Sequence, residues 1–529
     1  MRLSTLNMSL AATIMRATMG AAALAIPVAP NIALPVTDGL LARWNANFST
    51  VSVSGGRINA VSDLTGNGYP LGDEATGLGP RLTTYPNGLK AFRFNQDSFL
   101  SADTPTLGPL ASTVIAIIRD HNTRANNKTI VSAGKRSTTG GGKLAYTTAG
   151  VNGAAPYVGR AGTSSDTVVK PYLALGCQMQ VAGWRNGAIG TPGTAASNTA
   201  GQRCAVNQKS LNVANQNAAS AAGLEVGRNS ATTTSSSTVG AQNVANGDWY
   251  TGDIIELIVY SRPLRDDEFD LVMRALSEAY RIPEIKGQFA LEGDSRICSV
   301  LPTLPAENPG MWMTDPGSPY ALPKDVRVIN YAVGGSTTIY APNGPLRGRL
   351  DIGGATSGFQ CLIPGGRNLL ALMVGHNDLS QSAVIATADN PLTIYQNVNS
   401  LIHNASANSY LTLGWEVVLI VEIHNNNERY INGGNGWTGY RALQRSQVAG
   451  YNLLTDNNAG PGQTYEGKLR NLDVPLMTVG GQTVFATGPD TLNTNYYLPD
   501  RLHQAAEGMR VFVTGGDTPQ HGLRSVWPS

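Results

Sequence analysis

The chain has 529 residues, which is too long for one ordinary hydrophobic core, so two or more domains are expected. Charged residues make up only 14% of the chain and the net charge is +2. This composition excludes the strong, clustered basic excess that is typical of nucleic-acid-binding proteins. Sixty glycines, together with many Asn, Ser and Thr residues, favour numerous turns and β-structure of an extracellular or virion-associated kind.

Residues 1–35 contain an apolar run rich in small residues, TMGAAALAIPVAPNIALP, which follows Arg2 and Arg16. Two interpretations remain open for this segment: the core of a secretion signal, and a retained arm that docks into a larger assembly. We favour the arm because the flank before the run is long and three prolines interrupt the run. No other stretch reaches 18 uninterrupted apolar residues, so no membrane span is expected.

Residues 36–283 show the pattern of an antiparallel β-sandwich, or jelly roll. Short apolar runs such as 112–120 and 252–260 alternate with stretches rich in Gly, Asn, Ser and Thr. At the end of this region, residues 265–280 predict a helix, because apolar side chains recur at helical spacing and acidic residues occupy the first turn. The proline-containing segment 281–287 then predicts a hinge to the next domain.

The four cysteines divide evenly between the two halves of the chain: Cys177 and Cys204 in the first, Cys298 and Cys361 in the second. One disulfide in each domain and four reduced thiols both fit this pattern, and the sequence leaves the choice open. The chain contains no CxxC pair and no Cys/His cluster with metal-ligand spacing, so neither a metal site nor a cofactor is expected.

Residues 284–529 alternate strands and helices, which predicts an α/β domain of three layers with a parallel sheet. The expected strands are near-continuous apolar runs, as strands covered on both faces require. They span residues 288–292, 326–331, 368–374 and 416–423. The loops at the carboxyl ends of such strands form the edge at which active sites are built.

The strand at 288–292 ends in Gly293, Asp294 and Ser295, which predicts a tight turn that presents a serine at the start of a helix. Backbone N–H groups at a helix N-terminus stabilise an oxyanion that forms beside such a serine. A Gly-Asp-Ser string alone is a weak signal, because it usually marks only a turn. Three later segments add weight to it: VINYAVGGSTT (328–338), LLALMVGHNDL (369–379) and LPDRLH (498–503).

In this order and spacing, the four segments resemble the four sequence blocks of the SGNH hydrolases, also called the GDSL esterase/lipase family. The resemblance covers roughly residues 284–529 and implies a flavodoxin-like α/β fold with serine esterase activity. It implies that Ser295 is the nucleophile and that His503 serves as general base and then as general acid. Asp500 would hold the tautomer of the His503 ring and stabilise its charged form.

The same resemblance implies three donors to the oxyanion: the backbone N–H groups of Ser295 and Gly335, and the side-chain amide of Asn377. Gly335 is preferred over Gly334 because it lies five residues after Asn330, the offset usual in the family. Each assignment has a plainer alternative, namely a turn glycine, a helix cap and an exposed Asp/His pair. We prefer the catalytic interpretation because the four blocks occur in order on a compatible fold.

The segment HNNNERYINGGNGWTGYR, residues 424–441, follows the strand at 416–423 and is expected near the catalytic edge. It mixes hydrogen-bonding groups with flat apolar rings, which suit sugar hydroxyls and sugar ring faces. A long exposed loop would have the same composition, but we favour carbohydrate contact because loops at this edge commonly carry function. The candidate substrate-binding residues are Arg429, Tyr430, Trp437 and Tyr440.

Four segments of the first half, DGLLARWNAN, SDLTGNG, KAFRFNQDSFL and DWYTGDIIELIVYSRPLRDDEF, resemble in their order the concanavalin A-like, laminin-G-type lectin domain. The resemblance implies sugar binding, with Trp44, Trp184, Trp249 and Tyr250 as candidate stacking platforms. For any one of these aromatic residues, a place in the core is the preferred alternative. Because the sandwich supplies no candidate catalytic residue, we expect it to hold a polymeric substrate near Ser295 and to be dispensable for small esters.

The sequence therefore predicts a serine esterase, with a carbohydrate O-deacetylase acting on an acylated surface polysaccharide as the favoured activity. The expected partners are a polysaccharide or other cell-surface glycan and, through the N-terminal arm, further copies of the chain or virion proteins. The expected location is extracellular, on a phage virion as a tail fibre or spike in preference to a secreted enzyme. Two alternatives remain open: a secreted bacterial carbohydrate esterase, and a structural receptor-binding virion protein with little activity.

Overall fold

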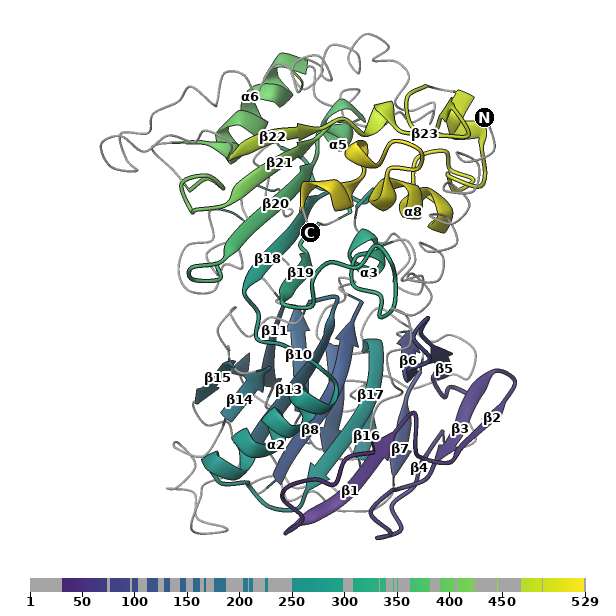
Figure 1. Ribbon diagram of the computed structural model, residues 1–529, viewed down its shortest axis with the longest axis vertical. Helices are drawn as coiled ribbons and strands as arrows, with labels where there is room; N and C mark the ends of the chain where they lie inside the picture. The colour runs from purple at the N-terminus through teal and green to yellow at the C-terminus, as the bar shows by residue number, and fades with distance from the viewer. Residues whose placement is uncertain are drawn as a thin grey trace, which may run out of the picture.

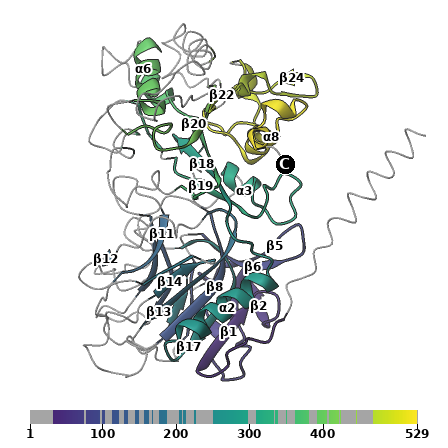
Figure 2. The same cartoon turned by 60° about the vertical axis from the view of Figure 1, so that its left-hand side comes forward.

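The computed structural model shows a β-rich part and an α/β part that lie one beyond the other along the long axis of the molecule (Figure 1; Figure 2). It describes residues 31–73, 77–95, 98–102, 112–121, 176–186, 250–297, 308–332, 334–338, 362–380, 391–404, 408–421, 468–487 and 489–527, together with strands between residues 128 and 226 and single residues elsewhere. Of the predicted N-terminal arm, only its last five residues, 31–35, belong to these ranges.

The β-rich part consists of two antiparallel sheets. The strands of the first are β1 (Leu40–Asn45), β5 (Arg81–Thr84), β6 (Lys90–Asn95), β8 (Ser112–Asp120), β13 (Met179–Asn186), β14 (Arg203–Val206), β15 (Lys209–Asn212) and β17 (Thr251–Tyr260). Their order is β15-β14-β13-β8-β17-β6-β5, and β1 also pairs with β17.

The second sheet has the order β12-β11-β10-β9-β16-β7-β4-β3-β2. Its strands are β2 (Val51–Ser54), β3 (Arg57–Val61), β4 (Leu71–Gly72), β7 (Leu100–Ala102), β9 (Lys128–Ala133), β10 (Lys143–Thr148), β11 (Pro156–Ala161), β12 (Asp166–Thr167) and β16 (Leu224–Val226). The antiparallel β-sandwich predicted from the sequence is confirmed for these strands.

Strand β8 lies inside the β-rich part and is buried on both of its faces. Val114, Ala116 and Ile118 contribute to the core between the sheets, whereas Ile115 and Ile117 pack on the opposite face. That opposite face is covered by helix α2 (Asp266–Ala279), whose apolar stripe belongs to the same cluster. The alternation follows from the period of two in a β-strand. The predicted helix at 265–280 is amphipathic because only one of its faces packs on this sheet.

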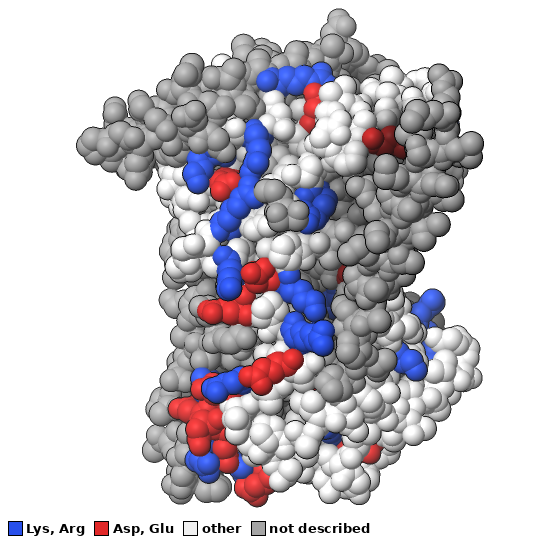
Figure 3. Space-filling model, viewed as in Figure 1, with Lys and Arg blue, Asp and Glu red and all other residues white. Residues whose placement is uncertain are grey.

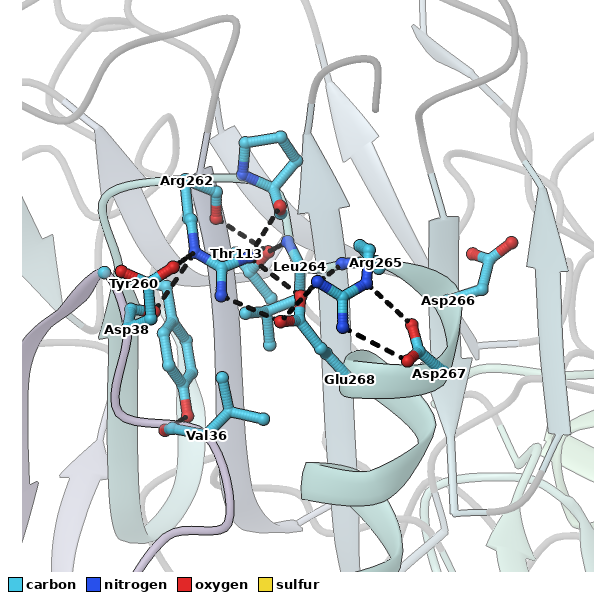
Figure 4. A network of polar contacts seen from close by, with 12 residues as sticks. Val36, Asp38, Thr113, Tyr260, Arg262, Leu264, Arg265, Asp266, Asp267 and Glu268 are labelled. Carbon is cyan, nitrogen blue, oxygen red and sulfur yellow. Dashed lines mark hydrogen bonds and ion pairs between the residues drawn. The ribbon is translucent and has the colours of Figure 1, made fainter. Parts of the chain in front are cut away.

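The start of α2 is fixed by a network of charged groups (Figure 4). The Arg265 backbone N–H donates to the Glu268 carboxylate at 2.8 Å, and the Arg262 guanidinium donates to the same carboxylate at 2.8 and 3.0 Å. The Leu264 N–H donates to Thr113 Oγ1 at 2.9 Å, which joins this turn to β8. Acidic side chains in the first turn also suit the positive end of the helix dipole.

The second part is built on a parallel sheet of five strands with the order β19-β18-β20-β21-β22. The strands are β18 (Gly287–Gly293), β19 (Val326–Asn330), β20 (Arg367–Met373), β21 (Glu416–Ile420) and β22 (Leu469–Leu472). The first four coincide with the apolar runs predicted to be strands, and β22 is a strand that the sequence analysis did not identify. The apolar runs predicted the strands well because both faces of this sheet are covered.

Two separate core clusters cover the two faces of the parallel sheet. The helices that contribute to the first cluster are α3 (Pro309–Trp312), α8 (Ala506–Thr514), η9 (Val474–Leu476) and η12 (Leu523–Val526). Helix α6 (Pro391–Ile402) contributes to the second cluster, on the other face. Short elements complete the C-terminal region: α5 (His376–Ser380), β23 (Thr478–Val479), β24 (Gln482–Thr483), η10 (Pro489–Leu492) and η11 (Pro519–His521). The expected parallel sheet with helices on both faces is therefore confirmed for the described residues.

The end of the predicted arm belongs to the sandwich rather than to a separate segment. Leu34 is buried, and the Ile32 carbonyl accepts a hydrogen bond of 2.8 Å from the Arg43 guanidinium. Trp44 and Tyr250 have no exposed surface, so their proposed role as sugar-stacking platforms is wrong and the core alternative holds. The side chains of Trp184 and Trp249 lie outside the described residues.

The two parts share a polar seam in addition to the linker at 281–287. The Cys177 N–H donates to the Val328 carbonyl at 2.7 Å, and the Val328 N–H donates to Gln178 Oε1 at 3.1 Å. A segment of the first part therefore pairs with the edge strand β19 of the parallel sheet. Cys177 is a buried thiol rather than half of a disulfide. It packs in a core cluster of the second part.

Arg119 of β8 reaches across this seam and is fully buried apart from 1% of its surface. Its guanidinium donates to the Cys177 and Met311 carbonyls at 2.9 and 2.7 Å. It also contacts the Thr314 hydroxyl at 3.0 Å and forms an ion pair of 2.9 Å with Asp315. The junction between the two parts is thus a packed interface rather than a loose hinge. In the part of the chain that the structure describes, no helix is both long and apolar enough to cross a membrane.

Candidate active site

The candidate nucleophile follows a turn that only glycine permits. Gly293, the last residue of β18, has φ +150°, and a Cβ built on it would lie 1.9 Å from the Met373 carbonyl oxygen of β20. Any side chain at this position would therefore overlap the neighbouring strand. The chain turns directly after it and leaves Ser295 partly exposed at the carboxyl edge of the sheet. The helix expected after Ser295 falls on residues from 298 onward, outside the described ones.

The residues on either side of Ser295 form a buried ion pair. The Arg296 guanidinium contacts the two carboxylate oxygens of Asp294 at 3.2 and 3.0 Å, and the Arg296 N–H donates to the same carboxylate at 3.0 Å. Asp294 is completely buried, and Arg296 is nearly so. A pair removed from water in this way is tolerated only when its hydrogen bonds are well made. These hydrogen bonds join Asp294 to Arg296 and so fix the turn that carries Ser295.

Ser295, His503 and Asp500 form a connected chain of contacts. His503 Nε2 lies 2.8 Å from Ser295 Oγ, and His503 Nδ1 lies 2.5 Å from Asp500 Oδ2. The other Asp500 oxygen accepts the N–H groups of Leu502 and His503 at 2.9 and 3.0 Å. The first distance lies within the range expected between a nucleophile and its general base. The structure thus brings together the three residues that the sequence nominated as a triad.

The environment of Asp500 favours its ionised form. Partial burial alone would raise the pKa of this carboxyl, but the hydrogen bonds from the His503 ring and from the Leu502 and His503 N–H groups outweigh it and lower the pKa below its usual value. A carboxylate that stays charged can orient the imidazole through Nδ1 and stabilise the imidazolium that forms in a reaction. This arrangement is suited to proton transfer from a serine hydroxyl.

The glycine pair after β19 lies beside Ser295. A Cβ built on Gly334 would lie 3.7 Å from the Ser295 Cβ, whereas nothing lies within 4 Å of one built on Gly335. The Asn377 side-chain amide donates to the Ser336 carbonyl at 2.9 Å, which ties α5 to the same loop. A Cβ on Gly334 would therefore approach Ser295 more closely than one on Gly335, the glycine that the sequence favoured as a donor. The role of Gly335 and Asn377 as oxyanion donors stays a prediction.

Asp378 supports this loop, a role that the sequence analysis did not assign. Its carboxylate accepts the Thr338 N–H at 2.9 and 3.0 Å and the Thr338 hydroxyl at 2.6 Å. Asn397 of α6 donates to the same hydroxyl at 3.2 Å. This aspartate belongs to the string Gly375-His376-Asn377-Asp378, which the sequence analysis had singled out. The partner of Asp378, Thr338, lies 40 residues away and could not be inferred from spacing.

We expect the Asp378→Asn variant to lose part of the pH dependence of stability. Burial raises the pKa of this carboxyl to about 6, although the Thr338 hydrogen bonds oppose the shift and Asp294 adds to it. Because the pKa in the folded state exceeds the value of about 3.9 in the unfolded state, ionisation of Asp378 destabilises the fold. The penalty of about 3 kcal/mol is complete above the folded-state pKa. It disappears as the pH falls toward the unfolded-state pKa.

The test is urea denaturation of both proteins at pH 8 and pH 5. The difference in unfolding free energy between variant and parent should change by about 1–2 kcal/mol between these pH values, because the neutral amide carries no such penalty. Parallel stability curves would show that Asp378 does not titrate in this range.

His376 does not line an open site, which answers a question that the sequence left open. It is completely buried, and this burial, together with the charge of Arg296 and the proximity of His503, lowers its pKa well below the usual value. The ring is therefore neutral at ordinary pH.

The predicted substrate-binding residues Arg429, Tyr430, Trp437 and Tyr440 lie outside the described residues. Among the residues that the structure does describe, no three His, Cys, Asp or Glu side chains are grouped so that they could hold a metal ion.

No protein-family model matches this chain, and no curated protein matches it. Similar solved structures include the Trypanosoma rangeli sialidase in complex with sialic acid, with 14% identity, 52% of this chain and 40% of that chain covered, and a TM-score of 0.28. Another is domain 4 of AbnA, a GH43 extracellular arabinanase from Geobacillus stearothermophilus, in complex with arabinotriose. It is 13% identical, the match covers 44% of this chain and 98% of that domain, and the TM-score is 0.29. The receptor binding domain of botulinum neurotoxin type G is 10% identical, the match covers 45% of this chain and 51% of that chain, and the TM-score is 0.25. The chain thus spans less than half of the sialidase, and TM-scores this low carry no conclusion about function.

Proposed function

We propose that this protein is a serine esterase of the SGNH type that removes small acyl groups from a glycan. The observation that carries the proposal is the contact chain from Asp500 through His503 to Ser295 at the carboxyl edge of a central parallel strand. A nucleophile, a base within 2.8 Å and a charged group that orients the base are the three parts that covalent acyl transfer requires.

In the proposed reaction, Ser295 Oγ attacks the ester carbonyl while His503 Nε2 accepts its proton. Asp500 keeps Nδ1 protonated and stabilises the resulting imidazolium. His503 then donates the proton to the leaving alcohol, and a water molecule activated in the same way releases the acid from Ser295. Backbone N–H groups at the Ser295 turn and the neighbouring glycine loop, with the Asn377 amide, would hold the oxyanion, each donor contributing about 3–4 kcal/mol.

A polymeric substrate is favoured by the openness of the site. Gly334 and Gly335 are exposed, Ser295 is partly exposed, and 42% of the Asp500 side chain is accessible. An open edge of this kind admits one acylated position of a long chain, whereas a lipase needs an enclosed apolar channel for its acyl group. O-acetyl groups on a surface polysaccharide are therefore our favoured substrate, and glycan binding is the role we propose for the sandwich.

The location on a phage tail fibre or spike forms part of this proposal and rests on the sequence of the N-terminal arm. A receptor-binding virion protein with little activity is the alternative of a different class. The two differ in one measurable property, because only the enzyme turns over an ester.

Purified protein should hydrolyse p-nitrophenyl acetate without added metal, and longer acyl chains should be poorer substrates. A fluorophosphonate probe, which labels serines activated by a base, should modify Ser295, with the position read by peptide mass spectrometry. Activity that disappears on addition of a chelator would refute the metal-free serine mechanism. A folded protein with neither turnover nor labelling would favour the receptor-binding alternative.

A further inference from the structure

A pocket of about 310 Å³ lies where the two parts of the molecule meet. Its walls come from the sandwich, from the residues after α2 and from the segment between α3 and β19. Val326, the first residue of β19, belongs to its lining, so the pocket lies at the amino end of the parallel sheet. Ser295 follows the carboxyl end of β18, and a strand of seven residues spans about 20 Å. The pocket is therefore separate from the candidate active site.

The walls of the pocket are mainly aliphatic, with Leu89, Met179, Ile282, Leu322 and Val326 among the lining residues. Its one aromatic residue, Tyr280, is 5% exposed, and its hydroxyl donates to the Glu256 carboxylate at 2.5 Å. Since no open aromatic face is offered, the lining is suited to an aliphatic body rather than to a sugar ring.

Two cationic residues, Arg281 and Lys324, also line this pocket, and both keep exposed surface. Within the part of the chain that the structure describes, neither forms an ion pair with a carboxylate. Partial desolvation, together with the charge of Arg281, lowers the pKa of Lys324 despite that exposure. The one acidic lining residue, Asp315, is paired with Arg119 at 2.9 Å. The lining consequently has an excess of positive charge. Figure 3 shows that both cationic and acidic side chains lie on the visible face where the two parts meet.

The backbone at Arg281 is also unusual. It has φ +52° directly after α2, where glycine is the residue that most often adopts this left-handed conformation. Arg281 thus occupies a position at which the backbone conformation favours glycine. The same residue belongs to the lining of the pocket.

We propose that this pocket binds a small carboxylate with an aliphatic body, with the carboxylate between Arg281 and Lys324 and the body against the apolar wall. A cavity of about 150 Å³ holds benzene, so twice that volume accommodates roughly ten to twelve non-hydrogen atoms. Octanoate, with ten non-hydrogen atoms, matches both the size and the charge. The proposal does not depend on the esterase activity, because none of the lining residues belongs to the triad.

The test is calorimetric titration of the full chain with octanoate. We expect one saturable site with a dissociation constant on the order of 0.1–1 mM, and binding at least about fivefold weaker for acetate and for octan-1-ol, which each lack one half of the ligand. Lys324→Gln and Arg281→Asn should each weaken octanoate binding about five- to tenfold. Asn is chosen because it tolerates the left-handed conformation.

The matched control is Lys286→Gln, which removes a nearby exposed cation that does not line the pocket and should leave the affinity unchanged. Ala321→Phe fills the pocket without altering its charge and should abolish binding. Absence of saturable binding would overturn the proposal. So would octanoate binding that persists in Ala321→Phe, or that weakens equally in Lys286→Gln, because the acid would then bind elsewhere.

Discussion

Ser295→Ala and His503→Ala should each lower kcat/KM for p-nitrophenyl acetate on the order of 10⁴- to 10⁶-fold. The reason is that each substitution breaks the 2.8 Å contact through which the hydroxyl loses its proton. Asp500→Asn should cost less than either, because the base remains and only its orientation and charge stabilisation are lost. The double variant Ser295→Ala/His503→Ala should be no worse than the single ones, since residues that act as a unit are not additive.

The matched control is His521→Ala in η11, which removes a histidine outside the contact chain and should leave turnover unchanged. Circular dichroism and thermal unfolding should show that all variants keep the parental fold. Residual turnover above one hundredth of the parent in folded Ser295→Ala would show that another group is the nucleophile.

The second large effect is expected at the seam between the two parts. Arg119→Met should lower the unfolding free energy by about 2–4 kcal/mol, because it removes a buried guanidinium donor from the Cys177 and Met311 carbonyls and breaks the ion pair with Asp315. The Thr314 hydroxyl would still donate to the Cys177 carbonyl at 2.9 Å, which limits the loss. Urea denaturation measures the loss. A methionine roughly preserves the volume of the side chain, so the loss reports the polar contacts rather than a cavity.

Arg203→Met provides the comparison for this substitution. Arg203 also pairs with two carboxylates, Asp266 and Asp270, but these are 63% and 49% exposed and belong to the same part of the molecule. Its removal should therefore cost only about 1 kcal/mol. Equal losses for the two variants would contradict the view that the seam is an important source of stability.

This seam changes the role expected for the sandwich. The sequence suggested that residues 1–283 are dispensable for small esters, since they contain no candidate catalytic residue. In the structure, Cys177 and Gln178 bond to Val328 at the edge of the parallel sheet, so deletion of the sandwich would leave that edge and its core unpaired. These contacts join residues about 150 positions apart, and no local pattern could have revealed them.

A bridge of side-chain amides extends from the seam to the nucleophile turn. Asn308 Nδ2 donates to the His121 carbonyl at 2.7 Å, while Asn308 Oδ1 accepts from Asn330 Nδ2 at 3.0 Å. Asn330 also donates to the Ile297 carbonyl at 2.6 Å, two residues after Ser295. The sandwich is thereby connected to the turn that presents the serine, although it supplies no reacting group.

The sequence predicted those features that depend on local chemistry. The strands of the parallel sheet were found because burial on both faces demands continuous apolar runs. The three residues of the contact chain, Ser295, His503 and Asp500, were found because they stand in ordered blocks. The partner of Asp378 was missed, since it depends on which distant loop lies opposite. Gly335 was preferred over Gly334 only on its offset from Asn330, and spacing could not show which of the two faces Ser295, because adjacent glycines differ in the direction in which the folded backbone turns them.

The spacing of the triad has a consequence for how activity is acquired. Ser295 and His503 are 208 residues apart, so their contact closes one of the longest loops in the chain. The entropy cost of closing a loop rises with its length, and contacts of large sequence separation form late in folding. Local pairings such as that of β2 with β3 close much shorter loops, whereas the pairing of β1 with β17 joins residues as distant as Leu40 and Tyr260. During refolding from urea, locally paired secondary structure should thus return before esterase activity, because activity requires the long-range contact between Ser295 and His503.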